Sequence, residues 1–425
     1  MLLSSIHKER DEPLGTRARL IRAGRMIPPR RTQDPAGRTP HDPATPHAGS
    51  RHAEGEIDTR VPGGRIRLFH MELRGVLVVE DADVPPRASR AGRIAAVEHV
   101  ANRPIAHHVL DVFESAGVDE IVVASSASQA GEVQECVSAH HAREAIPVRF
   151  VQQPGPLDVA AALRLSAPVV EDSPCIVHLA SGLLGEPLAA FVERLHEETP
   201  DVVAFVHQGP APDERLSTAT QEMLHIAALR PERAAMRMAG VWLFGRRALQ
   251  SAAPATWKVG GDVDLTAVAD RVAGLGGTLC VRLADAWRKY AGDPLDLLEL
   301  NRIVLDGLET DVRRLENNGN RIEGRVWIHE GASVRGSVIV GPSVIGPGAS
   351  VADAYIGPYT SVGAGARIEG AEVERSIISA GASVMHIGGR LVTSVVGRDA
   401  RVFRDFSLPR ALRLRVGDGT EVALC

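Results

Sequence analysis

The chain has 425 residues, a formal net charge of −5 and an apolar fraction of 44%. This length allows two or three domains, and the composition is that of a soluble protein with no bias toward nucleic acid or a membrane surface. No apolar run approaches the roughly 20 residues of a membrane-spanning helix. The four cysteines are far apart and show no metal-ligand spacing, so we expect reduced thiols and a cytoplasmic location.

Residues 1–70 are rich in Arg, Pro, His, Gly and Asp and show no sustained apolar period. Such a segment cannot bury enough surface to order itself. A transit peptide would be poor in acidic residues, whereas this segment carries many. We expect either a disordered extension or a mis-assigned start, with Met71 as the true beginning.

Residues 71–312 alternate short apolar runs with amphipathic stretches, which predicts an α/β domain with a doubly wound, mostly parallel sheet covered on both faces. The predicted strands are 75–79, 120–124, 148–151, 175–179, 202–206 and 240–244. The predicted helices are 103–116, 129–141, 158–166, 186–197 and, before the next domain, 293–309.

Residues 320–425 are predicted to form a left-handed β-helix with a C-terminal tail. An aliphatic residue returns every five or six positions, and the register repeats every 17 residues. Hexapeptide repeats produce this spacing, because each turn of a three-sided β-helix points one aliphatic residue inward per face. Glycine and small residues suit the corners. We expect about four coils, with these inward residues: Ile328, Val334, Ile339, Ile345, Val351, Ile356, Val362, Ile368 and Val373.

Four short motifs, together with this domain order, resemble the sugar-1-phosphate nucleotidylyltransferase family over residues 71–425. The likeness is greatest to the long form of glucose-1-phosphate thymidylyltransferase. Residues 100–105 are similar to the family's V-A-N-K-P-V, and residues 150–160 to its base-binding Q-x-x-P-L-G-L-A segment. Residues 240–244 are similar to G-V-Y-F-F, and residues 301–305 to N-R-L-V-L.

The resemblance also implies a catalytic loop that this chain does not carry. Family members cradle phosphates with a glycine-rich turn after the first strand, and that G-G-x-G-T-R turn aligns with residues 80–85. Here the turn contains Glu80, Asp81 and Asp83. Two anions about 4 Å apart repel by roughly 1 kcal/mol in water and by more in an enclosed site. We expect a solvated acidic loop, with metal binding by these acids as the alternative.

Other catalytic positions implied by the resemblance also differ. The lysine that follows the loop aligns with Ala95, and the cluster Arg87, Arg90 and Arg93 could compensate for its charge. The family's first metal-binding Asp aligns with Ser181. The second falls near Tyr290, in residues 287–292, which contain no carboxylate, although Asp293 follows directly.

Substrate-binding positions are only partly kept. The resemblance places a contact to the base edge at Gln153. The glycine beneath the base becomes Asp158, whose side chain would enter the pocket. In the sugar-binding segments the corresponding residues are Arg230, Asp262 and Asp264.

The leading hypothesis is a catalytically impaired family member that acts as a binding, regulatory or assembly subunit, because the removal of even one electrostatic donor slows such enzymes a hundred- to a thousandfold. Its partners would be a nucleotide or sugar nucleotide, further copies of itself, or an active paralogue, and no cofactor is assigned. The alternative is a diverged active enzyme that makes an NDP-sugar from a sugar 1-phosphate and an NTP with Mg²⁺. A third hypothesis, an acyltransferase using His329 or His386, is less favoured because four coils are short for that chemistry.

Overall fold

The structure is a computed structural model, and its described residues all lie in one unit, residues 67–425. They are residues 72–81, 94–140, 146–171, 173–189, 191–192, 202–208, 236–245, 277, 279–284, 286–309 and 319–406. The expectations for residues 1–70 and for the C-terminal tail after residue 406 lie outside them. No helix among the described residues is long and apolar enough to span a membrane.

A seven-stranded sheet forms the core of the first domain, in the order β10-β8-β9-β6-β1-β4-β5. Only β9 runs antiparallel to its neighbours β6 and β8. All six predicted strands are present, which confirms the mostly parallel sheet. The strands are β1 (Arg74–Val78), β4 (Glu120–Ser126), β5 (Val148–Gln153), β6 (Cys175–Leu179), β8 (Val202–Gln208), β9 (Met236–Phe244) and β10 (Leu279–Leu283).

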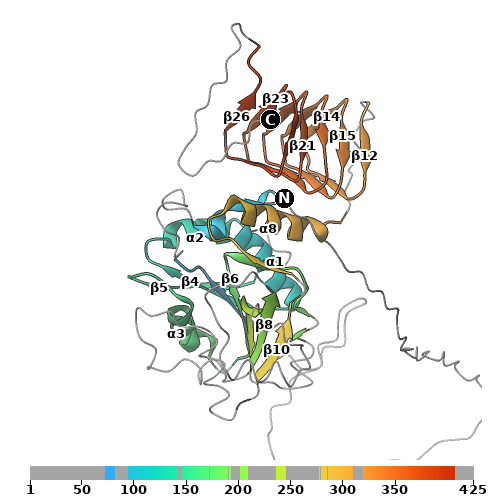
Figure 1. The fold of residues 1–425 in the computed structure, drawn as a ribbon. Coiled ribbons are helices and arrows are strands. Elements are labelled where there is room, and N and C mark those ends of the chain that lie inside the picture. Colours follow the sequence, from blue (N-terminus) through green and yellow to red (C-terminus); the bar gives the residue numbers. More distant parts are fainter. Residues whose placement is uncertain are drawn as a thin grey trace, which may run out of the picture. The chain divides into compact units, whose positions relative to one another are not determined.

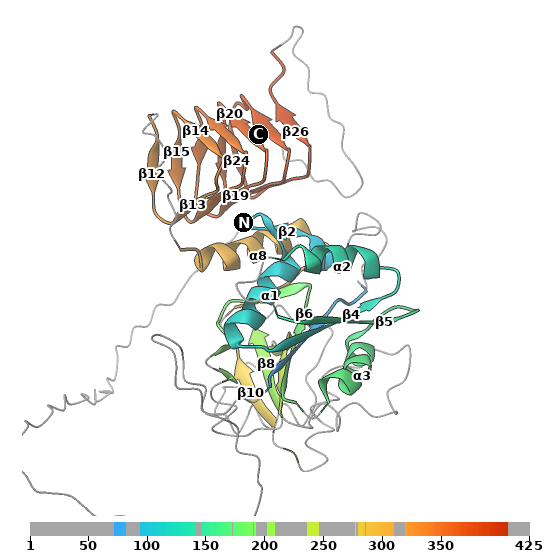
Figure 2. The same ribbon diagram turned by 180° about the vertical axis from the view of Figure 1, so that it is seen from behind.

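Helices cover both faces of this sheet, as predicted for a doubly wound fold. Helices α1 (Ile105–Ala116) and α2 (Ala130–Ser138) lie on one face and α3 (Val159–Val170) on the other (Figures 1 and 2). Helix α8 (Pro294–Asp306) follows the sheet in sequence and confirms the helix predicted over residues 293–309. The helix predicted over 186–197 falls mostly outside the described residues.

The strand order creates a switch point between β1 and β6. From β1 the chain moves outward through β4 to β5, and it then returns to β6 on the opposite side of β1. In open α/β sheets the crevice beyond the carboxyl ends of two such strands is the usual ligand position. Strand β7 (Gly182–Leu184), directly after β6, pairs antiparallel with β11 (Trp287–Lys289), which brings a distant segment to this edge.

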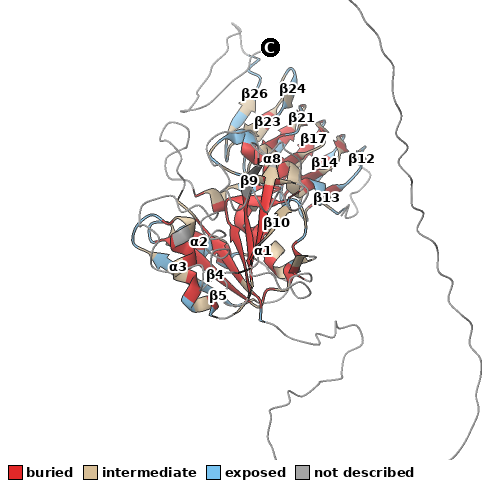
Figure 3. Cartoon of the chain, turned by 60° about the horizontal axis from the view of Figure 1, so that its bottom comes forward, coloured by how far each residue is buried: buried red, intermediate tan, exposed pale blue. Residues whose placement is uncertain are grey.

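The second domain is a β-helix with three parallel sheets of five strands each. All nine predicted inward residues are at most 3% exposed, and the buried interior is visible in Figure 3. One sheet contains β12 (Arg321–Glu323), β15 (Val338–Val340), β18 (Tyr355–Ile356), β21 (Glu372–Glu374) and β24 (Arg390–Val392). The second contains β13 (Val326–Ile328), β16 (Ser343–Ile345), β19 (Thr360–Val362), β22 (Ile377–Ile378) and β25 (Val395–Val396). The third contains β14 (Ser333–Arg335), β17 (Ser350–Ala352), β20 (Arg367–Glu369), β23 (Ser383–Met385) and β26 (Arg401–Phe403).

The β-helix therefore has five coils rather than the expected four. Early coils pair residues 17 positions apart, as in Arg321 with Val338. Later coils change this offset, because Ser361 pairs with Ile377 and Glu372 pairs with Arg390. The offset thus falls to 16 and then rises to 18. A prediction that assumes a constant repeat of 17 residues therefore misses the last coil.

Glycine at the corners has the predicted steric reason. Gly336 adopts a φ of +56°, and a Cβ atom there would lie 2.6 Å from Asp353 Oδ1 in the next coil. A side chain at Gly336 would therefore require the Asp353 carboxylate to move and would strain the left-handed backbone. The left-handed backbone and the close approach together favour glycine.

A set of polar contacts, here called the junction, joins the β-helix to the loop between β2 (His99–Val100) and β3 (Arg103–Pro104) and to α8. Asn301 is fully buried and accepts hydrogen bonds from Ala101 N, at 2.9 Å, and from the Ser361 hydroxyl. Its Nδ2 donates to Tyr359 O at 3.0 Å. Asn102 Nδ2 donates to Val362 O at 2.8 Å. Two of the family-like motifs therefore contribute their asparagines to the junction.

Candidate functional site

Three segments converge beyond the carboxyl ends of β1 and β6, at the switch point of the sheet. Glu80 follows β1, Ser181 follows β6, and Lys289 ends β11. Pairing of Lys289 with Gly182 fixes β11 beside the residue after Ser181. We call Glu80, Ser181 and Lys289 the switch-point cluster.

One carboxylate oxygen of Glu80 contacts both other members of the cluster, Ser181 and Lys289. Lys289 Nζ forms an ion pair with Glu80 Oε1, and the Ser181 hydroxyl donates to the same oxygen at 3.1 Å. Ser181 is 3% exposed, and its carbonyl accepts from Tyr290 N at 2.9 Å. The acid at the first loop position is thus neutralised within the protein.

Asp81 is likewise bound to the protein. Its Oδ1 accepts from Ser126 Oγ at 3.0 Å and from Gln129 Nε2 at 2.8 Å. Its Oδ2 accepts from Leu157 N at 2.6 Å. The carboxylate therefore ties the loop after β1 to the end of β4 and to the turn before α3.

Two further predicted site residues cap helices. Asp158 caps α3 by accepting from Ala161 N at 2.6 Å, and Asp293 caps α8 by accepting from Leu295 N at 2.9 Å. An aspartate directly before a helix, and for α8 a proline at its first position, is the sequence signal for this role. Gln153 Nε2 donates to the carbonyl of Pro156. Ligand contacts by these residues stay predictions.

The remaining predicted positions either lie outside the described residues or hold an uncharged side chain. Ala95 begins the short 3₁₀ helix η1 (Ala95–Val97). The others lie outside the described residues: Asp83, Arg87, Arg90, Arg93, Arg230, Asp262 and Asp264.

The residues at this edge do not fit a divalent cation. Mg²⁺ is held by carboxylates, waters and substrate phosphates, whereas the one carboxylate of the cluster, that of Glu80, is already bound by the ammonium of Lys289 and the hydroxyl of Ser181. Among the described residues, no three or more His, Cys, Asp or Glu side chains are placed to hold a metal ion. Sequence reasoning missed Lys289, although this lysine lies within residues 287–292, where the resemblance places the family's second metal-binding Asp.

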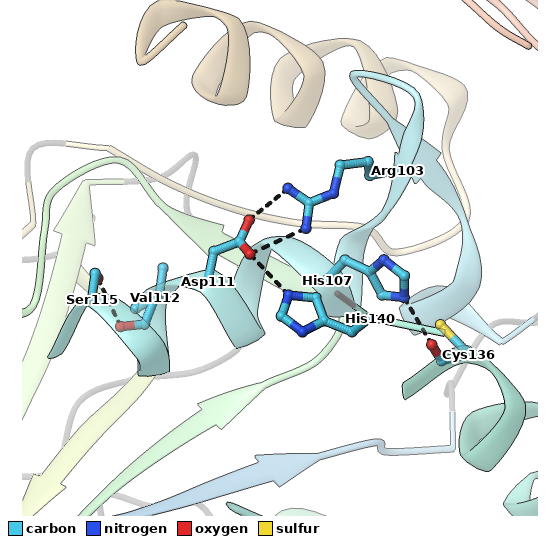
Figure 4. A network of polar contacts seen from close by, with 7 residues as sticks. All are labelled: Arg103, His107, Asp111, Val112, Ser115, Cys136 and His140. Carbon is cyan, nitrogen blue, oxygen red and sulfur yellow. Dashed lines mark hydrogen bonds and ion pairs between the residues drawn. The ribbon is translucent and has the colours of Figure 1, made fainter. Parts of the chain in front are cut away.

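A second group of titratable side chains, on α1 and α2, is paired internally (Figure 4). Arg103 binds both oxygens of Asp111, at 2.7 and 3.1 Å, and His140 Nε2 lies 2.9 Å from Asp111 Oδ1. Burial raises the pKa of Asp111, but the hydrogen bonds from His140 and Arg103 outweigh it and lower the pKa to about 2. His107 Nε2 lies 2.8 Å from Cys136 O. This group ties the two helices together.

A hollow of about 350 Å³ lies along β11 and α8, and its lining includes His207, Arg288 and Arg302. Asp296 Oδ1 lies 2.6 Å from Arg288 Nη2. Arg302 pairs with Glu299 at 3.1 Å and with Asp306 at 2.7 Å. Internal carboxylates therefore neutralise both arginines, as Glu80 neutralises Lys289 at the switch point.

Comparison with known proteins indicates the same kind of protein as the fold and the position of the site. Over 324 residues the chain is 28% identical to a glucose-1-phosphate thymidylyltransferase of Streptomyces griseus, covering 75% of this chain and 90% of the relative. The enzyme of the same name from Streptomyces antibioticus is 26% identical and is covered to 92% of its length, over 76% of this chain. This chain is a homologue of the sugar-1-phosphate nucleotidylyltransferases.

A third relative supports the same family. The low-salt glycan biosynthesis nucleotidyltransferase Agl11 of Haloferax volcanii is 25% identical over 76% of this chain and 92% of its own length. No family model matches the chain. The resemblance inferred from four motifs is thus confirmed. The matches cover 90% to 92% of the length of these three relatives.

Proposed function

We propose that this nucleotidylyltransferase homologue is catalytically impaired and acts in the cytoplasm by binding a nucleotide or sugar nucleotide, as a regulatory or assembly subunit. The observation that carries the proposal is the ion pair between Glu80 and Lys289 at the switch point. It occupies the edge of the sheet where the resemblance expects glycines and metal-binding carboxylates.

The electrostatics at this edge oppose the family reaction. Transfer of a nucleotidyl group with loss of pyrophosphate needs positive charge beside the developing anion. Among the described residues, Lys289 supplies a cation to the start of the loop after β1, and Glu80 already neutralises it. A triphosphate placed here would meet the carboxylate of Glu80 without a metal between them.

The expected loss of rate is large. Removal of a single electrostatic donor costs about a hundred- to a thousandfold, and losses within one site do not simply add. Replacement of the glycine turn, both metal carboxylates and the signature lysine is therefore expected to leave no more than about one ten-thousandth of a family member's rate.

The test is pyrophosphate release from each of the four nucleoside triphosphates, with glucose 1-phosphate and Mg²⁺. The thymidylyltransferase of Streptomyces griseus serves as the active control. We expect no release above the rate without protein. A turnover near one per second would overturn the proposal.

The β-helix supports the assembly part of the proposal. Among the strands that the structure describes, β12, β13 and β14, and likewise β24, β25 and β26, each pair on one side only. Exposed strand edges favour pairing with another chain. Light scattering after size exclusion should give a mass above that of one chain, and a monomer at all concentrations would remove this part.

A further inference from the structure

We propose that Lys289 takes the place of the divalent cation, so that the switch-point cluster binds a phosphate-bearing ligand without metal and in exchange for Glu80. This inference rests on the proposed function, binding of a nucleotide or sugar nucleotide, and adds how the protein would hold the phosphates. The ligand class is a diphosphate with one P–O–P linkage, such as a nucleoside diphosphate or a sugar nucleotide.

Position in the fold is the first support. Glu80 and Ser181 follow the two strands between which the chain reverses direction across the sheet. Ligands of open α/β sheets occupy this crevice because no connection crosses it. The described residues of the cluster thus stand where a ligand of this fold would lie.

The ion pair is unequal in its exposure. The side chain of Lys289 is 42% exposed, whereas that of Glu80 is 15% exposed. Lys289 is therefore the more accessible partner of the pair, and we expect a phosphate to reach it more readily than it reaches Glu80. If the ammonium turns toward a ligand, Glu80 still accepts a hydrogen bond from Ser181. The exchange leaves no buried carboxylate without a donor.

The residue type fits the role. A lysine ammonium is a compact point charge that binds phosphate without the fixed geometry of a guanidinium. Lys289 is the single lysine among the described residues, in a chain whose 48 basic residues are otherwise mostly arginine. An arginine at this position could also bind Glu80 with two parallel hydrogen bonds, which would hold the pair closed more firmly.

The charge balance selects a ligand with few charges. One ammonium replaces a doubly charged metal, and Glu80 and Asp81 remain nearby. A triphosphate brings more negative charge than this site can offset, while a sugar nucleotide carries only two charges on its diphosphate bridge. We therefore expect product-like ligands rather than the triphosphate substrates of the family.

The experiment measures binding of dTDP-glucose, dTDP and inorganic pyrophosphate to the full chain by titration calorimetry, in excess EDTA and in excess MgCl₂. We expect dTDP-glucose or dTDP to bind with equal affinity, within about threefold, in the two buffers. Lys289→Met should weaken binding at least tenfold, whereas Lys289→Arg should weaken it less, because the guanidinium keeps the positive charge but holds Glu80 more firmly. Glu80→Gln should tighten binding by roughly fivefold, because a repelling carboxylate is removed.

The matched control is Arg335→Met, which removes one exposed positive charge on the β-helix and should leave the affinity unchanged. Thermal melting of each variant verifies folding. Binding that rises more than tenfold with Mg²⁺, or that ignores Lys289→Met, would overturn the inference, and so would an absence of binding by all probes. None of these results touches the proposed loss of catalysis, which fails only if pyrophosphate is released at an enzymatic rate.

Discussion

The junction and the switch-point cluster are both small polar groups where loops meet, yet only one keeps the residue types of the family. The junction retains Asn102 and Asn301 within the motifs similar to V-A-N-K-P-V and N-R-L-V-L. The switch-point cluster has Glu80, Ser181 and Lys289 in place of the residues that the resemblance implies.

The two groups differ because their side chains have different hydrogen-bonding and charge requirements. Asn301 is fully buried, and its amide matches two donors and one acceptor at once. Few other side chains can replace it without leaving a buried polar group unpaired. The switch-point cluster is charged and partly exposed, so an acid and a base introduced together neutralise one another. Chemistry can therefore be lost there while the scaffold stays intact.

The largest expected effect comes from introducing at the switch point the residue types that the resemblance implies. In the variant carrying Glu80→Gly, Ser181→Asp and Lys289→Asp, two carboxylates replace a hydroxyl and an ammonium beside the sheet edge. Oxygen ligands of this kind hold Mg²⁺ and Mn²⁺, so we expect Mn²⁺ to bind at least tenfold more tightly, as measured by electron paramagnetic resonance.

The control for that variant is Ser181→Asp alone. There the ammonium of Lys289 remains and repels a cation, so Mn²⁺ binding should change little. Equal Mn²⁺ binding by the wild-type chain and the triple variant would show that the switch point is not where the metal of the family would lie.

Disruption of the junction should cost the most stability. Asn301→Ala leaves two buried donors, on Ala101 and Ser361, and the partly buried carbonyl of Tyr359 without their hydrogen bonds, at about 1–3 kcal/mol each, and we expect a total loss of about 4 kcal/mol. Chemical denaturation followed by circular dichroism measures the loss. Asn320→Ala is the matched control, because Asn320 also bonds two backbone groups of the β-helix but lies in a more exposed position. A loss no larger than that of the control would contradict a dominant role for the junction.

Acid should weaken the core directly behind the switch point. His178 on β6 is fully buried, with its ring centroid 5.8 Å from that of Trp287, and burial lowers its pKa from 6.5 to about 4 despite the hydrogen bond to Leu179 O. The unfolded chain therefore binds a proton near pH 6.5 that the folded chain refuses until about pH 4. Stability is complete above 6.5 and falls as the pH drops toward 4, by up to roughly 3 kcal/mol.

Urea unfolding across that interval tests this dependence, with His178→Leu as the comparison. The variant cannot titrate at this position, so its free energy of unfolding should fall less steeply with acid. Parallel pH profiles for the two proteins would exclude His178 as the source.

The smallest effect separates capping from ligand binding at Asp158. Asp158→Ala should cost about 1 kcal/mol through the lost cap of α3, whereas Asp158→Asn should cost almost nothing, because asparagine caps equally well. Asp293→Ala and Asp293→Asn at α8 form the matched pair. A loss of dTDP affinity in Asp158→Asn at unchanged stability would assign Asp158 to the ligand site as well.

Sequence alone determined the elements whose signal is local or periodic. The nine aliphatic residues from Ile328 to Val373 specify the β-helix, because each coil repeats the same inward positions. The alternation of apolar and amphipathic runs likewise specifies the doubly wound sheet. The resemblance in four short motifs was enough to indicate the family.

Only the tertiary structure decided which polar groups meet. The contact between Asn301 and Ala101 joins residues 200 positions apart, and Glu80 meets Lys289 because β7 pairs with β11. Neither pairing leaves a period or a spacing in the chain. The reason is that ion pairs and amide hydrogen bonds depend on positions in space, which the fold brings together from distant segments.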